Sequence, residues 1–180
     1  VIPNGTLAIG DSAFLNYKSL VSVTIPDSVT FIGNKAFYAC ESLPSVSIGD
    51  SVVSIGDQAF MYCSALKSIV IPNSVTNIGA SAFSCCSSLD SVAIGNGLRK
   101  ISDNTFYKCS ALVDFTMPDS IESIGKHAFF TCKSLKNINV PRTVTTIGAY
   151  AFSGCSELES IHIPEGVLEI RERTFENCSS

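Results

Sequence analysis

Residues 32–40 read Ile-Gly-Asn-Lys-Ala-Phe-Tyr-Ala-Cys, and most of the chain is either a copy of this stretch or a connection between two copies. Its phenylalanine belongs to a series in which consecutive members are 23 residues apart, without a gap. The series is Phe14, Phe37, Phe60, Phe83, Phe106, Phe129, Phe152 and Phe175. A fixed period of this length predicts a solenoid, in which every repeat forms one coil that stacks on the previous coil.

The second copy of the repeat shows what each part of a coil should do. Leu20, Val23 and Ile25 are the apolar positions of one segment, and Val23 and Ile25 alternate with Ser22 and Thr24. This pattern predicts a half-buried strand that ends at Pro26. The chain then bends and turns at Gly33, and alanine, phenylalanine and cysteine follow at helical spacing over a segment too short for a stable helix. One coil has too few apolar side chains to offset its loss of conformational entropy, so neighbouring coils must supply the second contact face.

Aligned copies form columns of equivalent positions. The leucine column and the bend column do not vary, and the strand columns are mostly β-branched, as a pleated surface favours. The turn glycine, however, is replaced by Ser102 and Arg171 in two copies, where Thr105 and Thr174 also replace alanine. A position that required a positive φ would resist both replacements, so we expect close approach or a simple turn preference to explain the glycine. Arg171 must then face solvent.

Composition and the chain ends limit the possible classes of protein. The 180 residues are 46% apolar and only 16% charged, with a net charge of −4 and no basic stripe, which disfavours a nucleic-acid partner. No apolar run is long enough to span a membrane, and the N-terminus lacks the features of a signal peptide. We expect one domain over residues 1–180, an array of nearly eight coils. Because neither end carries a polar capping unit, we interpret it as a fragment of a longer protein.

At residues 135–155 the repeat reads Leu-x-x-Ile-x-Val-Pro-x-Thr-Val-x-x-Ile-Gly-x-x-Ala-Phe-x-x-Cys, which resembles the BspA-type leucine-rich repeat. The resemblance covers essentially the whole chain. It implies a right-handed superhelix with a parallel β-sheet on one face and short extended or helical turns on the others. Proteins of this family occur on the surfaces of oral and gut bacteria and some parasitic protists, and several adhere to host matrix proteins. The resemblance therefore implies a cell-surface or secreted protein, with no catalytic residue or cofactor to carry over.

Seven of the eight cysteines form a further column at the same period: Cys40, Cys63, Cys86, Cys109, Cys132, Cys155 and Cys178. Stacking brings neighbouring Cα atoms into disulfide range, but the Cβ atoms stay further apart than the roughly 3.8 Å that a bridge prefers. We therefore expect buried free thiols that act as small apolar side chains. Cys85 lies one residue out of phase, and we expect it to be the most accessible thiol.

The sequence predicts no metal site and no enzyme. A zinc site needs four converging ligands, yet Cys85–Cys86 is the only close pair, and His127 and His162 occupy different repeat positions. Repeat phase places no serine or cysteine beside both a histidine and an acid, as nucleophilic catalysis requires. We expect no catalytic residue, no metal and no cofactor.

The outward positions of the strand segments are the main candidate for binding. In the early copies they are mostly serine and threonine, whereas the later copies carry charged and amide side chains. Because specificity on a regular scaffold can reside where the surface varies, we predict a partner-binding set in coils five to seven. The set is Asp114, Thr116, Asn137, Asn139, Arg142, Ser160 and His162. The alternative is that these polar residues only keep a wide sheet soluble.

A second stripe follows the phenylalanine column and consists of Leu15, Tyr38, Met61, Ser84, Tyr107 and Phe130. We expect neighbouring coils to half-cover these side chains, and an interaction patch is the alternative.

Two functions fit these patterns. The first is a non-enzymatic binding or adhesion module for a protein or glycan, such as a component of the host extracellular matrix. The second is a passive spacer or stalk that carries an adjacent domain. The strong similarity among copies favours the spacer, whereas the changed surface of coils five to seven favours binding. The sequence gives no indication of oligomeric state.

Overall fold

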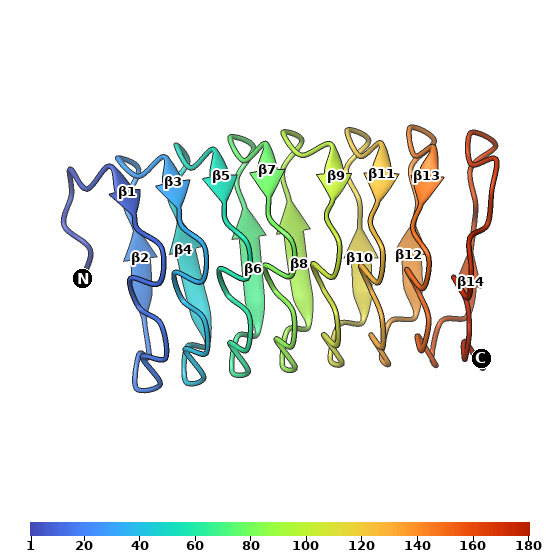
Figure 1. Cartoon of the computed structure of the whole chain (residues 1–180), viewed down its shortest axis with the longest axis horizontal. Helices are drawn as coiled ribbons and strands as arrows, with labels where there is room; N and C mark the ends of the chain where they lie inside the picture. The colour runs from blue at the N-terminus through green and yellow to red at the C-terminus, as the bar shows by residue number, and fades with distance from the viewer.

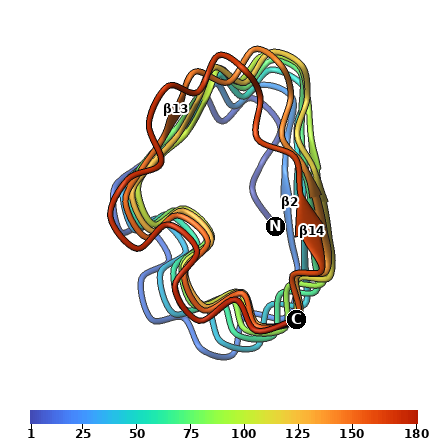
Figure 2. The same cartoon turned by 90° about the vertical axis from the view of Figure 1, so that its right-hand side faces the viewer.

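A computed structural model describes all 180 residues as a β-solenoid without α-helices. The coils stack along one axis, with the chain termini at opposite ends (Figure 1). Viewed along the axis, the coils lie nearly behind one another, with β2 and β14 on one long side and β13 on the opposite side (Figure 2). The predicted repeat solenoid with parallel strands is confirmed.

Each coil contributes one strand to either side of the solenoid, except that the first coil has only a bend strand and the last only a leucine-segment strand. The leucine-rich segments form β2 (Val23–Ile25), β4 (Ser45–Ile48), β6 (Ser68–Ile71), β8 (Ser91–Ile94), β10 (Asp114–Thr116), β12 (Asn137–Asn139) and β14 (Ser160–Ile161). We call their outward surface the strand face. The bend isoleucines form a second row of two-residue strands, the bend row: β1 (Ala8–Ile9), β3 (Phe31–Ile32), β5 (Ser54–Ile55), β7 (Asn77–Ile78), β9 (Lys100–Ile101), β11 (Ser123–Ile124) and β13 (Thr146–Ile147).

Strand register follows the repeat. Every paired strand is parallel to its neighbour, and each residue pairs with its equivalent one repeat away, as Val46 does with Ile69. Buried and exposed residues alternate along β4 and β6. Because a slip by one residue would turn the buried isoleucines to solvent, the alternation fixes the register.

The phenylalanine column forms the centre of one continuous core. Consecutive rings are stacked with centroids 5.0–5.8 Å apart. The six internal rings are fully buried, and Phe14 and Phe175, which each have a neighbour on one side only, are partly buried. The predicted buried column is thus confirmed for its internal members.

The expectation of helical turns is wrong, because the segment around each phenylalanine forms consecutive tight turns. In the second coil the N–H groups of Ala36, Tyr38 and Cys40 each donate to the carbonyl three residues earlier. Lys35 and Ala39 have left-handed backbones, with φ of 54° and 55°, and every coil repeats this pair of conformations. A left-handed residue ends a helical turn and points its N–H elsewhere. The N–H of Lys35 donates to Asp57 and that of Ala39 to Met61, both in the next coil and both at 2.8 Å. Hydrogen bonds between coils replace those within a helix.

Close approach of the coils explains the turn glycines. A Cβ built on Gly79 would lie 2.4 Å from the backbone nitrogen of Asp57, whereas none of the turn glycines has a positive φ. Where Ser102 replaces glycine, its hydroxyl donates to the carbonyl of Ile78 at 2.6 Å. Thr105 donates its own hydroxyl to the Ser102 carbonyl at 2.8 Å. Arg171 is exposed, as expected.

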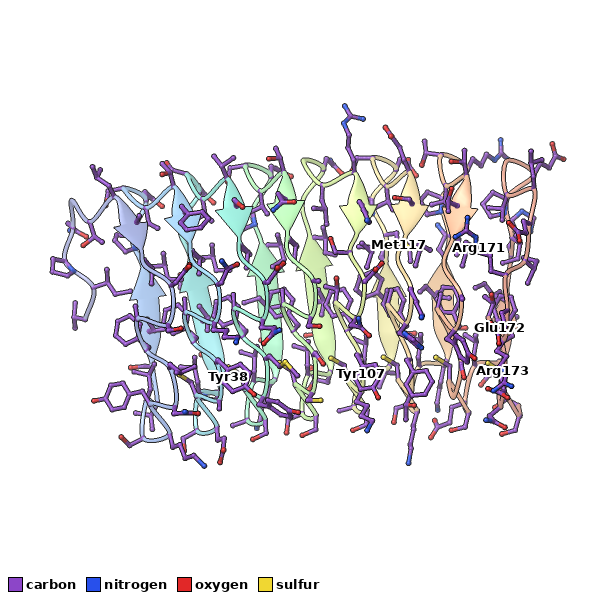
Figure 3. The ribbon with its side chains drawn as sticks, in the orientation of Figure 1. Tyr38, Tyr107, Met117, Arg171, Glu172 and Arg173 are labelled. Carbon is purple, nitrogen blue, oxygen red and sulfur yellow. The ribbon has the colours of Figure 1, made fainter.

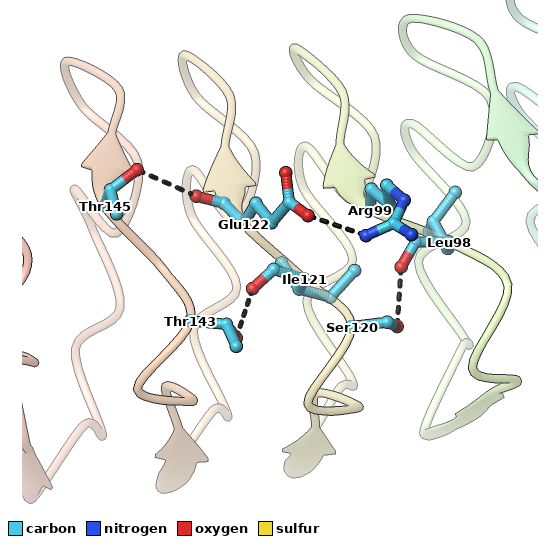
Figure 4. A network of polar contacts seen from close by, with 7 residues as sticks. All are labelled: Leu98, Arg99, Ser120, Ile121, Glu122, Thr143 and Thr145. Carbon is cyan, nitrogen blue, oxygen red and sulfur yellow. Dashed lines mark hydrogen bonds and ion pairs between the residues drawn. The ribbon is translucent and has the colours of Figure 1, made fainter.

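Polar side chains also connect neighbouring coils. The Asp11 carboxylate accepts the N–H of Asn34 at 2.7 Å, and the Asp57 carboxylate accepts the N–H of Ala80 at the same distance. Ser120 donates its hydroxyl to the Leu98 carbonyl one coil earlier at 2.7 Å (Figure 4). These side chains bind backbone groups that the strands leave unpaired, so their conserved chemistry along the chain serves the scaffold.

Both rows of strands are interrupted at one place, between residues 74–94 and the residues one repeat later. β8 does not pair with β10, and β7 does not pair with β9. The N–H groups of Val113 and Arg99 lack the inter-coil bonds that their equivalents Lys136 and Glu122 make at 2.9 and 2.8 Å. We call this junction the seam.

Three local sequence changes coincide with the seam. Gly97 stands where Ser74 and Ser120 supply a hydroxyl to the preceding coil, so this link is missing. Ala80 lacks the carboxylate that Asp57 uses for the same purpose. Phe115 stands where other strands carry valine or isoleucine, and its larger ring packs edge-on against the phenylalanine column. These three changes lie where β8 and β10 lose their ladder hydrogen bonds.

Truncation of an internal phenylalanine should leave a cavity in the core. Phe83→Ala should lower the free energy of unfolding by about 3–5 kcal/mol, as measured by urea denaturation. Phe31, whose side chain is 39% exposed on the bend row, supplies the matched control, because Phe31→Ala removes the same atoms from the surface. Equal losses for the two variants would contradict the buried column.

Amide hydrogen exchange should reveal the seam. Arg99 and Val113, whose N–H groups have no backbone acceptor, should exchange faster than Glu122 and Lys136, which occupy the same repeat positions one coil later. Residue-resolved exchange followed by NMR measures both pairs in one sample. Equal protection within each pair would show that the seam is closed in solution.

Candidate binding surface

The structure brings the predicted binding residues together on three neighbouring strands. All seven side chains are exposed. Asp114 in β10, Asn137 in β12 and Ser160 in β14 form one row in register, and Thr116 pairs with Asn139 in the next row. Neighbouring strands lie about 4.8 Å apart, so the two rows form one contiguous polar surface. His162 follows directly after β14 and Arg142 follows β12.

Few contacts tie these side chains to the scaffold. The Asn137 amide donates to the Asp114 carboxylate at 3.2 Å, and Arg142 and His162 make no ion pair. In an earlier copy the residue equivalent to Arg142 links two coils, because the Asp27 carboxylate accepts the N–H of Asp50 at 2.9 Å. A guanidinium cannot accept this bond. Arg142 therefore has no structural role of the kind that its equivalents have.

The stripe beside the phenylalanine column is half-covered, as expected. Tyr38, Met61, Tyr107 and Phe130 are partly buried, and Tyr38 and Tyr107 lie along the same edge of the array (Figure 3). Two members of the stripe differ from this pattern. Ser84 is buried, and Leu15, which has a neighbouring coil on one side only, is 41% exposed.

The sequence analysis missed aromatic residues from two other columns that join this stripe. Tyr62 packs edge-on against Tyr38 with centroids 5.5 Å apart. His127 lies 5.3 Å from Phe130 and 4.9 Å from Tyr150. The spacing of three between residues 127 and 130, combined with a tight turn, was the available signal, because such a turn places both side chains on one side.

The thiol column is reduced, and each thiol also donates a hydrogen bond. Cys63 Sγ lies 3.2 Å from the Phe37 carbonyl of the preceding coil, and all seven in-phase cysteines repeat this contact. Six of them are buried, whereas Cys178 in the last coil and the out-of-phase Cys85 are partly exposed. Burial raises the pKa of the Cys63 thiol from its ordinary 9.0 to about 12, and that of Cys155 likewise. The buried thiols are therefore protonated and inert at neutral pH.

The side chains form no arrangement typical of catalysis or metal binding. No group of three or more histidine, cysteine, aspartate or glutamate side chains could hold a metal ion. Every buried polar side-chain atom has a hydrogen-bond partner, so none points to a missing ligand. His127 belongs to the aromatic stripe, where burial lowers its pKa. The structure contains no helix that could span a membrane.

Parallel coils with a leucine in every repeat define a leucine-rich-repeat solenoid. Residues 1–113 and 99–180 match the model of a protein family described as "BspA type Leucine rich repeat region (6 copies)". The chain belongs to this family, which confirms the resemblance in the repeat. No curated protein sequence matches the chain.

Solved bacterial leucine-rich-repeat structures are similar to the chain. A leucine-rich repeat protein of T. pallidum is 30% identical, with a TM-score of 0.80 over 86% of this chain and 72% of that one. Proteins from Eubacterium ventriosum and Bacteroides ovatus are each 28% identical, with TM-scores of 0.83 and 0.71 over 90% and 97% of this chain. The chain spans only 44% and 57% of the length of those two proteins. These likenesses show the fold and leave the partner open.

Alkaline pH should destabilise the protein through the buried thiols. Above pH 9 the unfolded chain releases thiol protons, whereas the native thiols keep them until the pH approaches their raised pKa. Each such thiol should lower the free energy of unfolding by up to about 1.4 kcal/mol per pH unit in this window. Urea denaturation at a series of pH values measures the slope.

Cys63→Ser is the matched variant for this measurement, because its hydroxyl can donate to the Phe37 carbonyl but does not titrate. Its stability should fall less steeply with pH than that of the parent chain. Identical slopes for the two proteins would show that Cys63 ionises equally well in the native state.

Proposed function

We propose that the chain is a non-enzymatic binding module whose strand face over β10, β12 and β14 holds a protein or glycan partner. The observation that carries the proposal is the exposed row of Asp114 and Asn137 in register on β10 and β12, with Asn139 beside it and Arg142 and His162 beyond the ends of β12 and β14. In the β2–β8 sheet serine, threonine, valine and alanine stand in place of Asp114, Asn137, Asn139 and His162, whereas Arg142 replaces aspartate or asparagine. Neither Arg142 nor His162 forms an ion pair within the protein. The guanidinium and the imidazole are therefore free to bind a ligand.

A rigid sheet suits this role. Backbone hydrogen bonds between coils fix the strands, so side chains on the strand face lose little freedom when a ligand binds. Asp114 supplies acceptors, Arg142 supplies a fork of donors, and the amides of Asn137 and Asn139 supply both. Mixed donors and acceptors at a regular spacing fit the polar surface of a protein or the hydroxyl groups of a glycan.

We place this module on a cell surface or in a secreted protein, with a component of a host extracellular matrix as one possible partner. The family resemblance supports this location. The thiol column is compatible with it, because buried thiols of raised pKa resist oxidation outside the cell.

The competing function is a passive spacer or stalk. Its support is the uniform strand face of β2, β4, β6 and β8, where small residues repeat with little variation. A spacer requires a stiff array and no particular surface. The two functions differ in whether the residues of the strand face of coils five to seven can be replaced without loss.

Replacement of Asp114, Asn137 and Arg142 together by serine tests the binding function. The residues are exposed, so the melting temperature should change little, whereas capture of immobilised matrix proteins or glycans should weaken by about tenfold or more. Surface plasmon resonance against an array of such ligands measures the binding.

The matched control replaces an amide, a cation and an acid of the bend row and its margin, Asn77, Lys100 and Glu122, by serine. This control should bind like the parent chain. Equal binding by the strand-face variant would place the contact elsewhere, and an absence of binding by the parent chain to any ligand would favour the spacer.

A further inference from the structure

A shallow furrow of about 450 Å³ runs along the turn edge of the solenoid, away from the strand face. One wall is the column of second left-handed residues, and the other is the column two positions later. The lining residues come from four successive coils: Tyr62, Cys85, Lys108 and Thr131 on one wall, and Ser64, Ser87, Ser110 and Lys133 on the other. The furrow therefore follows the solenoid axis.

The furrow is positively charged on a protein whose net charge is −4. Lys108 and Lys133 line it from adjacent coils, and no carboxylate does. Neither lysine forms an ion pair with a side chain of the protein. The Lys108 ammonium lies 5.3 Å from the centre of the Tyr107 ring. Two unpaired ammonium groups in one furrow favour an anionic ligand.

The backbone of the furrow offers little to an extended peptide. The N–H groups of Tyr62, Cys85, Lys108 and Thr131 all donate to carbonyls of the next coil at 2.7–2.9 Å. A peptide added as a further strand needs free backbone groups to pair with. The hydroxyls of Ser64 and Ser110 already donate to carbonyls of the preceding coil. The donors that remain are the two ammonium groups and the hydroxyls of Ser87 and Thr131, which suit the oxygens of a polysaccharide.

The spacing of the coils points to the same ligand. Phenylalanine rings along the array are 5.0–5.8 Å apart, close to the length of one hexose unit. Side chains on one side of an extended peptide recur every ~6.6 Å, which drifts out of phase with the coils. The Tyr62 side chain, 42% exposed at one end of the furrow, offers a ring on which a sugar can stack.

We propose that this furrow binds a linear anionic polysaccharide, with Lys108 and Lys133 on its sulfate or carboxylate groups and Tyr62 against a sugar ring. The site is separate from the strand face. It stands whether or not the strand face binds a partner.

Dextran sulfate and neutral dextran test the proposal, because they share a sugar backbone and differ in charge. The chain should bind dextran sulfate, more weakly as ionic strength rises, and should not bind dextran. Lys108→Thr with Lys133→Ser, which installs residues found elsewhere in the same columns, should weaken binding at least about tenfold. Polyglutamate of similar charge should bind more weakly than dextran sulfate.

A control variant separates the furrow from general charge attraction. Lys100→Ser with Lys126→Ala removes the same charge from the bend side and should bind dextran sulfate like the parent chain. An equal loss in this control would overturn the furrow as the site. Polyglutamate binding as tight as dextran sulfate would overturn the polysaccharide as the ligand class.

Cys85 provides a second readout at the site itself. Cys85 lines the furrow, whereas Cys178, the other partly exposed thiol, lies in the last coil outside it. Bound dextran sulfate should slow modification of Cys85 by a thiol reagent and leave that of Cys178 unchanged, as measured by peptide mass spectrometry. Equal rates at Cys85 with and without dextran sulfate would contradict the proposal even if the polymer binds.

Discussion

The contacts that the turn around each phenylalanine makes with the neighbouring coils are the interactions on which the rest of the solenoid depends. There the ring stacks on its equivalents, the two left-handed residues donate to the next coil, and the cysteine thiol donates to the carbonyl of the preceding phenylalanine. At the seam both strand rows are interrupted, yet Phe83 still donates to Thr105 and its ring still stacks on Phe106. The strands are thus regular where local residues permit it, and the phenylalanine turn is continuous throughout.

Dependence on this turn explains which sequence predictions succeeded. Period, strand alternation and the invariant columns predict stacked coils, parallel register and buried phenylalanines, because all three follow from one repeated side-chain pattern. The sequence could not show that residues such as Lys35 and Ala39 are left-handed, since neither residue type favours that conformation. Their conformation is imposed by hydrogen bonds to a coil that lies 23 residues away in the chain. The helical turns were therefore predicted wrongly, and the thiol hydrogen bonds were not predicted at all.

The binding surfaces follow the same division. Exposure of Asp114 and Asn137 could be predicted from strand alternation, and so could their alignment on neighbouring strands. The furrow could not, because it lies between columns whose side chains vary without a pattern and whose shape depends on the left-handed turns. Residues such as Asp57 show the converse. A carboxylate that looks like a candidate ligand in the sequence is occupied by a backbone N–H of the next coil.

The seam changes the mechanics of the array. On either side of the seam lies a stiff stack of coils. The phenylalanine turns join the two stacks by hydrogen bonds, whereas most inter-coil backbone hydrogen bonds of the strand face and the bend row are missing there. Such a joint bends most easily in the direction that opens the two strand rows, and tension along the axis concentrates at the few bonds that remain. An array pulled from its ends would therefore part more readily beside the coil that contains Phe115 than between internal coils whose strands pair in both rows.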